Sequence, residues 1–129
     1  MTPPEQIATD VVDAAFQVHS TLGPGLLENA YEACMVHELT CRGYKIEQQR
    51  VQPVIYRGLQ IEAGYRLDLL VNDQVILELK AIDQLLPIHQ AQLMTYLRLS
   101  GKTLGFLINF NVPVIKVGIK RVVMNHSNF

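Results

Sequence analysis

The chain has 129 residues, 49% hydrophobic and 18% charged, which is typical of one globular domain over residues 1–129. The sequence contains eleven Lys and Arg residues and twelve Asp and Glu residues. The resulting net charge of -1 argues against a broad basic surface for non-specific nucleic-acid binding, but it leaves room for a local basic groove. No apolar run is long enough to span a membrane, and Cys34 and Cys41 lie about 10 Å apart along a predicted helix, too far for a disulfide. We therefore expect a cytoplasmic protein with free thiols and no membrane partner.

Two helices are predicted at the start of the chain. The first covers about residues 3–21, with a proline at its first helical position. Its apolar residues recur at helical spacing, at Ile7, Val11, Ala14, Val18 and Leu22. Gly23-Pro24-Gly25 ends this helix with a sharp loop. The second helix covers about residues 26–42 and stops at Gly43, a residue suited to a left-handed C-terminal cap.

One face of the second helix carries Glu28, Tyr31 and Glu32, at spacings of three and four. Glu28 near the helix start has a simple structural interpretation, a favourable contact with the helix dipole. Tyr31 has one too, a half-buried place in the core. Both also have the chemistry to take part in a binding site, so these alternatives stay open at this point.

The middle of the chain predicts extended structure. We expect one or two strands within residues 44–61, another over residues 61–71 and another over residues 75–81. The polar break Asn72-Asp73-Gln74 predicts a tight turn between the last two.

Three charges interrupt these last two strands, at Asp68, Glu78 and Lys80. Because strand side chains alternate in direction, Glu78 and Lys80 share a face, and a hairpin about Asp73 brings Asp68 beside them. Carboxylates and a strand carbonyl suit Mg2+ or Mn2+, and a nearby ammonium can polarise a phosphate or orient a water molecule. The structural alternative is a buried ion pair between Lys80 and one of the carboxylates.

A third helix is predicted over residues 87–101, from a proline near its start to a glycine at its stop. His89, Gln92 and Tyr96 share one face of it. An amide and a phenol on one stripe can bind a phosphate or a carboxylate, and the alternative is a surface stripe whose ring covers the sheet. Two strands follow, over residues 103–109 and 115–124.

Two helices, strands with Asp68 and Glu78-x-Lys80, and a helix with Gln92-x-x-x-Tyr96 occur in this order. The combination resembles the PD-(D/E)XK nuclease superfamily. Within it, Gly25-Leu26-Leu27-Glu28-Asn29-Ala30-Tyr31 is similar to the name-giving motif of the GxxExxY proteins. The resemblance covers about residues 7–123, with Leu67 in place of the proline that often precedes the first acid.

The resemblance implies an α/β fold with a restriction-endonuclease-like core, a central mixed β-sheet flanked by helices in the order α-α-β-β-β-α-β-β. It implies that Mg2+ or Mn2+ is held by Asp68, Glu78 and the backbone carbonyl of Leu79. Lys80 would position the hydrolytic water or stabilise charge on the phosphate, and Glu28 would add an acidic group from a helix. The expected substrate-binding residues are Gln92, Tyr96 and Tyr31.

The function expected from this resemblance is metal-dependent hydrolysis of phosphodiester bonds in DNA or RNA. The main alternative is a catalytically inactive module that keeps the fold and binds protein or nucleic acid, and a third is a small phosphoester hydrolase. We expect a nucleic acid as partner and leave a homodimer open.

Overall fold

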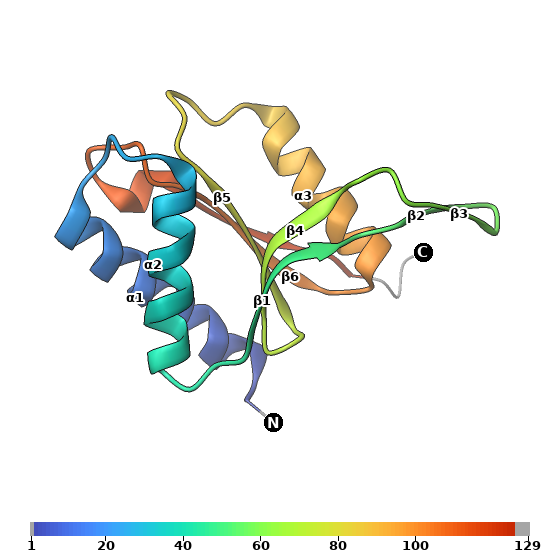
Figure 1. Ribbon diagram of the computed structural model, residues 1–129, viewed down its shortest axis with the longest axis horizontal. Coiled ribbons are helices and arrows are strands. Elements are labelled where there is room, and N and C mark those ends of the chain that lie inside the picture. Colours follow the sequence, from blue (N-terminus) through green and yellow to red (C-terminus); the bar gives the residue numbers. More distant parts are fainter. Residues whose placement is uncertain (1, 126–129) are drawn as a thin grey trace.

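The computed structural model describes residues 2–125 (Figure 1). Its elements follow one another as α1 (Pro4–Leu22), α2 (Glu28–Cys41), β1 (Ile46–Val51), β2 (Val54–Tyr56), β3 (Leu59–Ile61), β4 (Arg66–Val71), β5 (Val75–Lys80), α3 (Pro87–Ser100), β6 (Leu104–Asn109), the 3-10 turn η1 (Ile115–Gly118) and β7 (Ile119–Val123). Within this part of the chain, no helix is long and apolar enough to cross a bilayer. All three predicted helices are present, with ends within about two residues of those expected.

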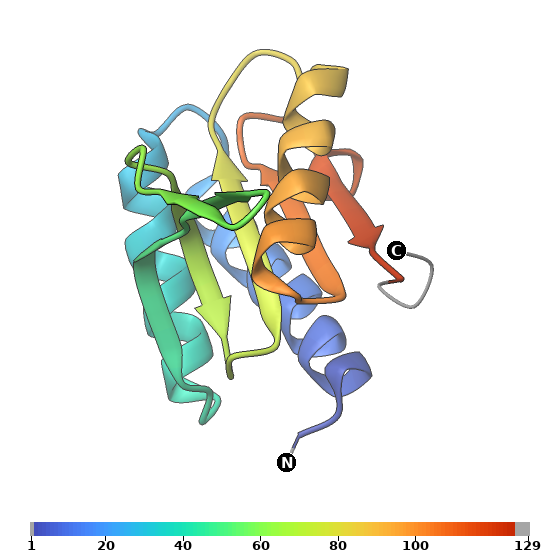
Figure 2. The same cartoon turned by 90° about the vertical axis from the view of Figure 1, so that its right-hand side faces the viewer.

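The centre of the molecule is a five-stranded sheet in the order β1-β4-β5-β6-β7. The β5–β6 pair is parallel and the other neighbours are antiparallel, so the sheet is mixed. Helices α1 and α2 cover one face, and α3 covers the other (Figure 2). The predicted fold class is therefore confirmed. The order α-α-β-β-β-α-β-β holds for the central sheet, with a separate β2–β3 ribbon inserted after β1.

The two sides of the sheet form two cores, and β5 contributes to both. Val75, Leu77 and Leu79 pack in the core under α1 and α2, whereas Ile76 packs in the core under α3. Because side chains alternate along a strand, Glu78 lies on the same side as Ile76. Its carboxylate thus belongs to the α3 side of the sheet, at the end of a fully buried run.

The turn between β4 and β5 fixes their register. Asn72 and Asp73 have φ values of 51° and 56°, and the Gln74 N–H donates to the Val71 carbonyl at 2.9 Å. Two successive left-handed residues are typical of a type I′ turn, whose twist matches that of antiparallel strands. The predicted tight turn is therefore confirmed.

Two predicted strands differ from the structure. The strand expected over residues 61–71 is divided, because β3 ends at Ile61 and β4 begins only at Arg66, with Gly64 between them at a φ of 83°. The last strand begins at Ile119 rather than at residue 115, because residues 115–118 form η1. A Cβ added at Gly118 would lie 2.2 Å from the Asn109 carbonyl oxygen, so this close approach requires glycine.

Candidate functional site

The site lies at a fork, the point where β4 and β5 separate. Their backbone pairing runs from Val71 opposite Val75 to Leu69 opposite Leu77, and the same register sets Asp68 opposite Glu78. From there on, hydrogen bonds from backbone N–H groups to the two carboxylates take the place of backbone pairing between the strands. The Asp68 N–H donates to Glu78 Oε2 at 2.9 Å, and the Leu79 N–H donates to Asp68 Oδ2 at 2.8 Å. The fork therefore holds two carboxylates face to face, each fixed by a backbone donor from the other strand.

These hydrogen bonds engage one oxygen of each carboxylate. The other Asp68 oxygen, Oδ1, accepts only a long 3.4 Å bond from Gln49 Nε2, and no hydrogen bond within residues 2–125 engages Glu78 Oε1. Glu78 is only 5% exposed, and burial, followed by the negative charge of Asp68, raises its pKa to about 8. The hydrogen bond from Asp68 N and the charge of Lys80 oppose this rise without cancelling it. Burial and the charge of Asp68 thus outweigh the positive charge that Lys80 supplies at the fork.

Lys80 follows Glu78 on the same side of β5 and is half-buried. Its charge lowers the pKa of both Glu78 and Glu28, which places the ammonium in the same electrostatic environment. In the described part of the chain, however, Lys80 forms no ion pair with an N···O distance under 4.0 Å. The structural alternative, a tight buried ion pair, is not the arrangement found here.

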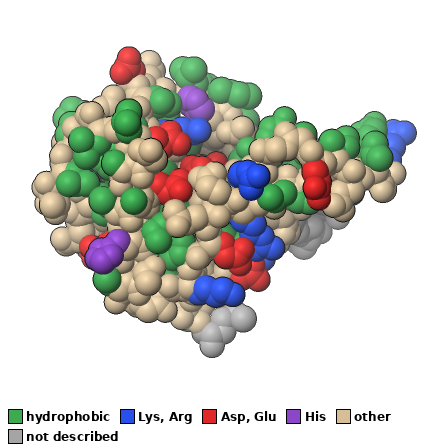
Figure 3. Space-filling view, in the orientation of Figure 1, with side chains coloured by type: hydrophobic (Ala, Val, Ile, Leu, Met, Phe, Trp, Pro, Cys, Tyr) green, Lys and Arg blue, Asp and Glu red, His purple; other side chains and the backbone are tan. Residues whose placement is uncertain are grey.

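Glu28 approaches this region from the other side, as the first residue of α2. Burial raises its pKa most, and the negative charges of Asp68 and Glu32 raise it further, whereas Lys80 lowers it. Acidic side chains gather on this face between α2 and the projecting ribbon (Figure 3). Still, no three acidic, histidine or cysteine side chains among residues 2–125 come close enough to enclose an ion.

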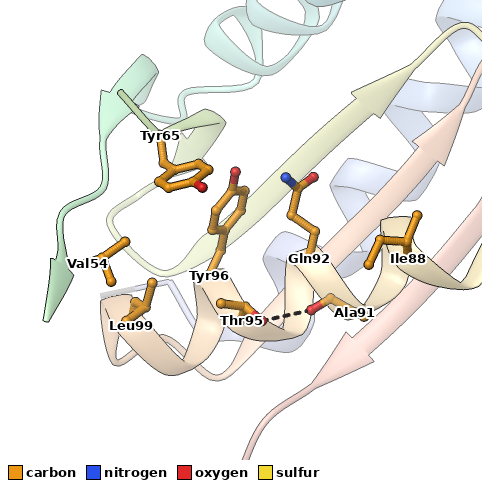
Figure 4. Close-up of a pocket in the computed structure, with 8 residues that line it drawn as sticks. All are labelled: Val54, Tyr65, Ile88, Ala91, Gln92, Thr95, Tyr96 and Leu99. Atoms are coloured by element: carbon orange, nitrogen blue, oxygen red, sulfur yellow. Dashed lines mark hydrogen bonds between the residues drawn. The ribbon is translucent and has the colours of Figure 1, made fainter. Parts of the chain in front are cut away.

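Gln92 and Tyr96 reach the same region from α3. Tyr96 is 6% exposed, and its pKa is raised by burial first and then by the charge of Glu78, with smaller effects of Tyr65 and Asp68. Both α3 residues line a cavity of about 380 Å³, with Tyr65 facing Tyr96 across it (Figure 4). His89, predicted on the same stripe, caps the helix, because its Nδ1 accepts the Leu86 N–H at 2.9 Å.

The elements that form the fork are matched by one known protein family. The family model of the PD-(D/E)XK nuclease superfamily matches residues 5–122. The chain belongs to this superfamily. The match spans every element from α1 to β7 and so includes the fork. No curated protein and no solved structure shows significant similarity to the chain.

PD-(D/E)XK nucleases generally use divalent metal ions, and the chemistry of the fork fits one. Asp68 Oδ1 and Glu78 Oε1 are hard oxygen donors of the type that Mg2+ and Mn2+ prefer. Burial first, and then the charge of Asp68, raises the pKa of Glu78, and a bound cation would favour the ionised form of both carboxylates. The Leu79 carbonyl comes from the same strand end. These groups supply part of a coordination shell, and water or a phosphate oxygen would complete it.

The position of Tyr31 corrects the expected substrate contact. This PD-(D/E)XK chain buries the Tyr31 side chain completely, stacked on Phe110 with ring centroids 4.5 Å apart and planes 7° apart. Its hydroxyl donates to the Gly23 carbonyl at 2.7 Å and accepts the Leu26 N–H at 3.1 Å. A ring with no exposed surface does not reach a substrate. Tyr31 instead fixes the loop before α2, and thereby the position of Glu28.

Gln49 is a site residue that the sequence did not reveal. It lies in β1 at a φ of 51°, between the pairs Gln48–Leu69 and Arg50–Leu67, where the regular ladder is interrupted. Its amide Nε2 donates to Glu32 Oε1 at 2.9 Å and, more weakly, to Asp68 at 3.4 Å. Gln49 therefore links the acidic face of α2 to the fork. A glutamine in a polar strand carries no sequence signal for this role.

Proposed function

We propose that the chain is a metal-dependent nuclease that hydrolyses phosphodiester bonds of DNA or RNA, with Mg2+ or Mn2+ held by Asp68, Glu78 and the Leu79 carbonyl. The observation that carries this proposal is the fork, where two carboxylates face each other beside a lysine that has no close ion-pair partner among residues 2–125. A buried pair of like charges is costly to folding, and a bound cation relieves that cost.

When bound, a divalent ion would supply Lewis acidity and lower the pKa of water at the phosphate. The protein's own residues do the remaining work. Lys80 stabilises negative charge that develops on the phosphate or holds the attacking water. Glu28, the first residue of α2, would accept a hydrogen bond from that water. The backbone donors of Asp68 and Leu79 keep both carboxylates in place during the reaction.

The test of this function is cleavage by wild type and by Lys80→Ala in Mg2+ or Mn2+. Loss of the lysine should lower the rate about a hundred- to thousandfold, a typical cost of removing one electrostatic contributor at such a site. Labelled single-stranded DNA, duplex DNA, RNA and a simple phosphodiester cover the substrate classes. Arg57→Ala, a substitution at the tip of the β2–β3 ribbon, is the control for contaminating nuclease. Equal residual cleavage by wild type and Lys80→Ala on every substrate would contradict the proposal.

A non-catalytic module that binds protein or nucleic acid is the second candidate. It is favoured by one observation, that no three candidate ligand side chains among the described residues gather closely. Such a module would show neither metal binding nor cleavage, so the same assay separates the two functions. Membership of the GxxExxY group, a homodimer and a cytoplasmic location stay predictions.

A further inference from the structure

The cavity between α3 and the loop before β4 lies beside the carboxylates and has no role in the chemistry proposed for them. We propose that this cavity, lined by Tyr65, Tyr96 and Gln92, binds an unpaired nucleobase of a single DNA strand whose adjoining phosphate lies at Asp68 and Glu78. The inference rests on the proposed function, because that function is what puts a nucleic-acid phosphate at these two carboxylates. It adds the substrate class, a single strand in place of an intact duplex.

The two tyrosines give the cavity an aromatic wall. Tyr65 is 45% exposed, and its ring lies 6.4 Å from that of Tyr96 at an angle of 58°. The two rings are therefore tilted and do not stack, which leaves a face of Tyr65 available. Every base has a π-face, so an exposed tyrosine at the edge of a cavity is a stacking platform for bases of any sequence. The cavity volume of about 380 Å³ falls within the range of about 300–1,000 Å³ for small-molecule pockets.

The polar groups of the cavity are placed to bind the edge of a base. Gln92 and Tyr96 extend from α3 in the same direction, toward the space that Tyr65 borders (Figure 4). Neither the Gln92 amide nor the Tyr96 hydroxyl makes a hydrogen bond to any of residues 2–125. An amide supplies both donors and an acceptor, and a phenol supplies one of each. The cavity thus combines a stacking surface with free hydrogen-bonding groups.

The cavity lies on the same side of the sheet as Glu78. Tyr96 packs there in one core with Leu67 and Ile76, which precede Asp68 and Glu78 along β4 and β5 by one and two positions. The charges of Glu78 and Asp68 add to the effect of burial in raising the pKa of the Tyr96 hydroxyl. Across the cavity, Tyr65 is followed directly by Arg66, whose Nη1 donates to the Gln49 carbonyl at 3.3 Å. Gln49 in turn contacts Asp68. Arg66 therefore places a cation next to Gln49, the residue that contacts Asp68, and this cation is available to the backbone of a bound strand.

This arrangement selects against an intact duplex. A base inside a duplex is stacked and paired, so it enters such a cavity only after unstacking, which costs a few kcal/mol. A single strand avoids most of that cost. Four of the other lining residues are apolar, namely Val54, Ile88, Ala91 and Leu99. The fifth, Thr95, already donates its hydroxyl hydrogen to the Ala91 carbonyl at 3.1 Å, so none of the five offers a free donor to a ribose 2′-hydroxyl. We therefore assign the occupant as DNA.

Two pairs of matched variants test the cavity. Tyr65→Ala removes the stacking ring, whereas Tyr65→Phe keeps it. Ala91→Leu fills the cavity from an exposed position on α3, whereas Ala33→Leu makes the same change at an exposed position on α2 that lines a different hollow. Fluorescence anisotropy would measure the Kd of each for a labelled DNA strand in Ca2+, with the strand checked for integrity. Thermal unfolding would confirm that each variant is folded.

Tyr65→Ala and Ala91→Leu should each raise the Kd for single-stranded DNA about 5- to 100-fold, the usual effect of losing one base–aromatic stack. Tyr65→Phe and Ala33→Leu should stay within about twofold of wild type, and blunt duplex DNA should bind more weakly than the single strand. Equal Kd values for strand and duplex, or wild-type binding by Tyr65→Ala and Ala91→Leu, would overturn the inference. Tighter binding of RNA of the same sequence would overturn the assignment to DNA.

The cleavage assay, applied to the same variants beside the binding measurement, separates this inference from the proposed function. Metal-dependent cleavage that is lost in Lys80→Ala but unaffected in Tyr65→Ala would refute the nucleobase cavity and leave the nuclease. Conversely, Tyr65-dependent binding of a single strand without any metal-dependent cleavage would support the cavity and refute the nuclease.

Discussion

At the scale of single residues, the fork shows how the chain keeps two like charges together. Asp68 and Glu78 each accept a backbone N–H from the opposite strand, while burial and then the charge of Asp68 raise the pKa of Glu78. Alternation along the strands and one turn at Asp73 were sufficient to predict that these residues meet. The hydrogen bonds that hold them depend on where β4 and β5 separate. No local sequence pattern indicates that point.

The raised pKa of Glu78 predicts how the metal-free protein responds to pH. Because the folded-state pKa, about 8, exceeds the usual value of 4.5, folding favours the protonated form. That stability is fully present below about pH 4.5 and is lost as the pH rises toward 8. In EDTA, the Tm of wild type should therefore fall between pH 5 and 8 relative to that of Glu78→Gln, which carries no titrating group there. Parallel Tm profiles for the two proteins, measured by differential scanning fluorimetry, would contradict this expectation.

Tyr31→Phe is expected to affect both stability and activity. The substitution keeps the ring on Phe110 but removes the hydroxyl that binds Gly23 and Leu26. Loss of these bonds should lower the free energy of unfolding by about 1–3 kcal/mol, measured in urea. Because the loop they hold leads into α2 and Glu28, the cleavage rate should fall while the Kd for DNA stays near that of wild type. A variant with weakened DNA binding and an unchanged cleavage rate would show instead that Tyr31 contacts substrate.

At the scale of elements, the helices and the β4–β5 hairpin were predicted because their signals are local. Helical spacing, prolines near helix starts and Gly101 at the end of α3 act within a few residues. The β2–β3 ribbon, the irregularity at Gln49 and the turn η1 were not predicted in these forms. They depend on which strand pairs with which, and on the contact of Gly118 with Asn109, between segments that the sequence does not show to be neighbours.

The packing of α1 on α2 gives a prediction at this scale. Tyr44, just after α2, donates a hydrogen bond to Asp10 of α1, and this bond is the largest cause of the lowered pKa of Asp10. A lowered pKa contributes stability above the usual value of 3.8, and this stability is lost as the pH falls through the folded-state pKa.

Tyr44→Phe should therefore lower the free energy of unfolding by about 1.5 kcal/mol at pH 7, the net value of one hydrogen bond to a charged group. The difference from wild type should shrink in strong acid, where Asp10 is protonated in both proteins. Urea titrations at pH 7 and pH 2.5 would measure it, and an equal difference at both values would show that packing, not the carboxylate, is responsible. Tyr56→Phe, in the exposed ribbon, is the matched control and should leave stability unchanged.

At the scale of the whole molecule, the site is assembled from segments that are distant in the sequence. The α2 helix brings Glu28, the hairpin brings Asp68, Glu78 and Lys80, and α3 brings Tyr96. The net charge of -1 argued only against a broad basic surface. It could not show that acidic groups gather on one face beside an aromatic cavity, because that arrangement exists only once the sheet separates α1 and α2 from α3 (Figures 2 and 3). The family match over residues 5–122 agrees with this architecture.

The proposed hydrolysis depends above all on a divalent ion at the fork. A crystal grown with Mn2+ and measured near the manganese absorption edge would locate the ion directly by its anomalous signal. We expect one strong peak within coordination distance of Asp68 and Glu78 in the wild-type protein, and no peak there in Asp68→Asn, which removes the charge of one ligand. A wild-type map without a peak at the fork, from crystals that bind Mn2+ elsewhere or not at all, would contradict the account.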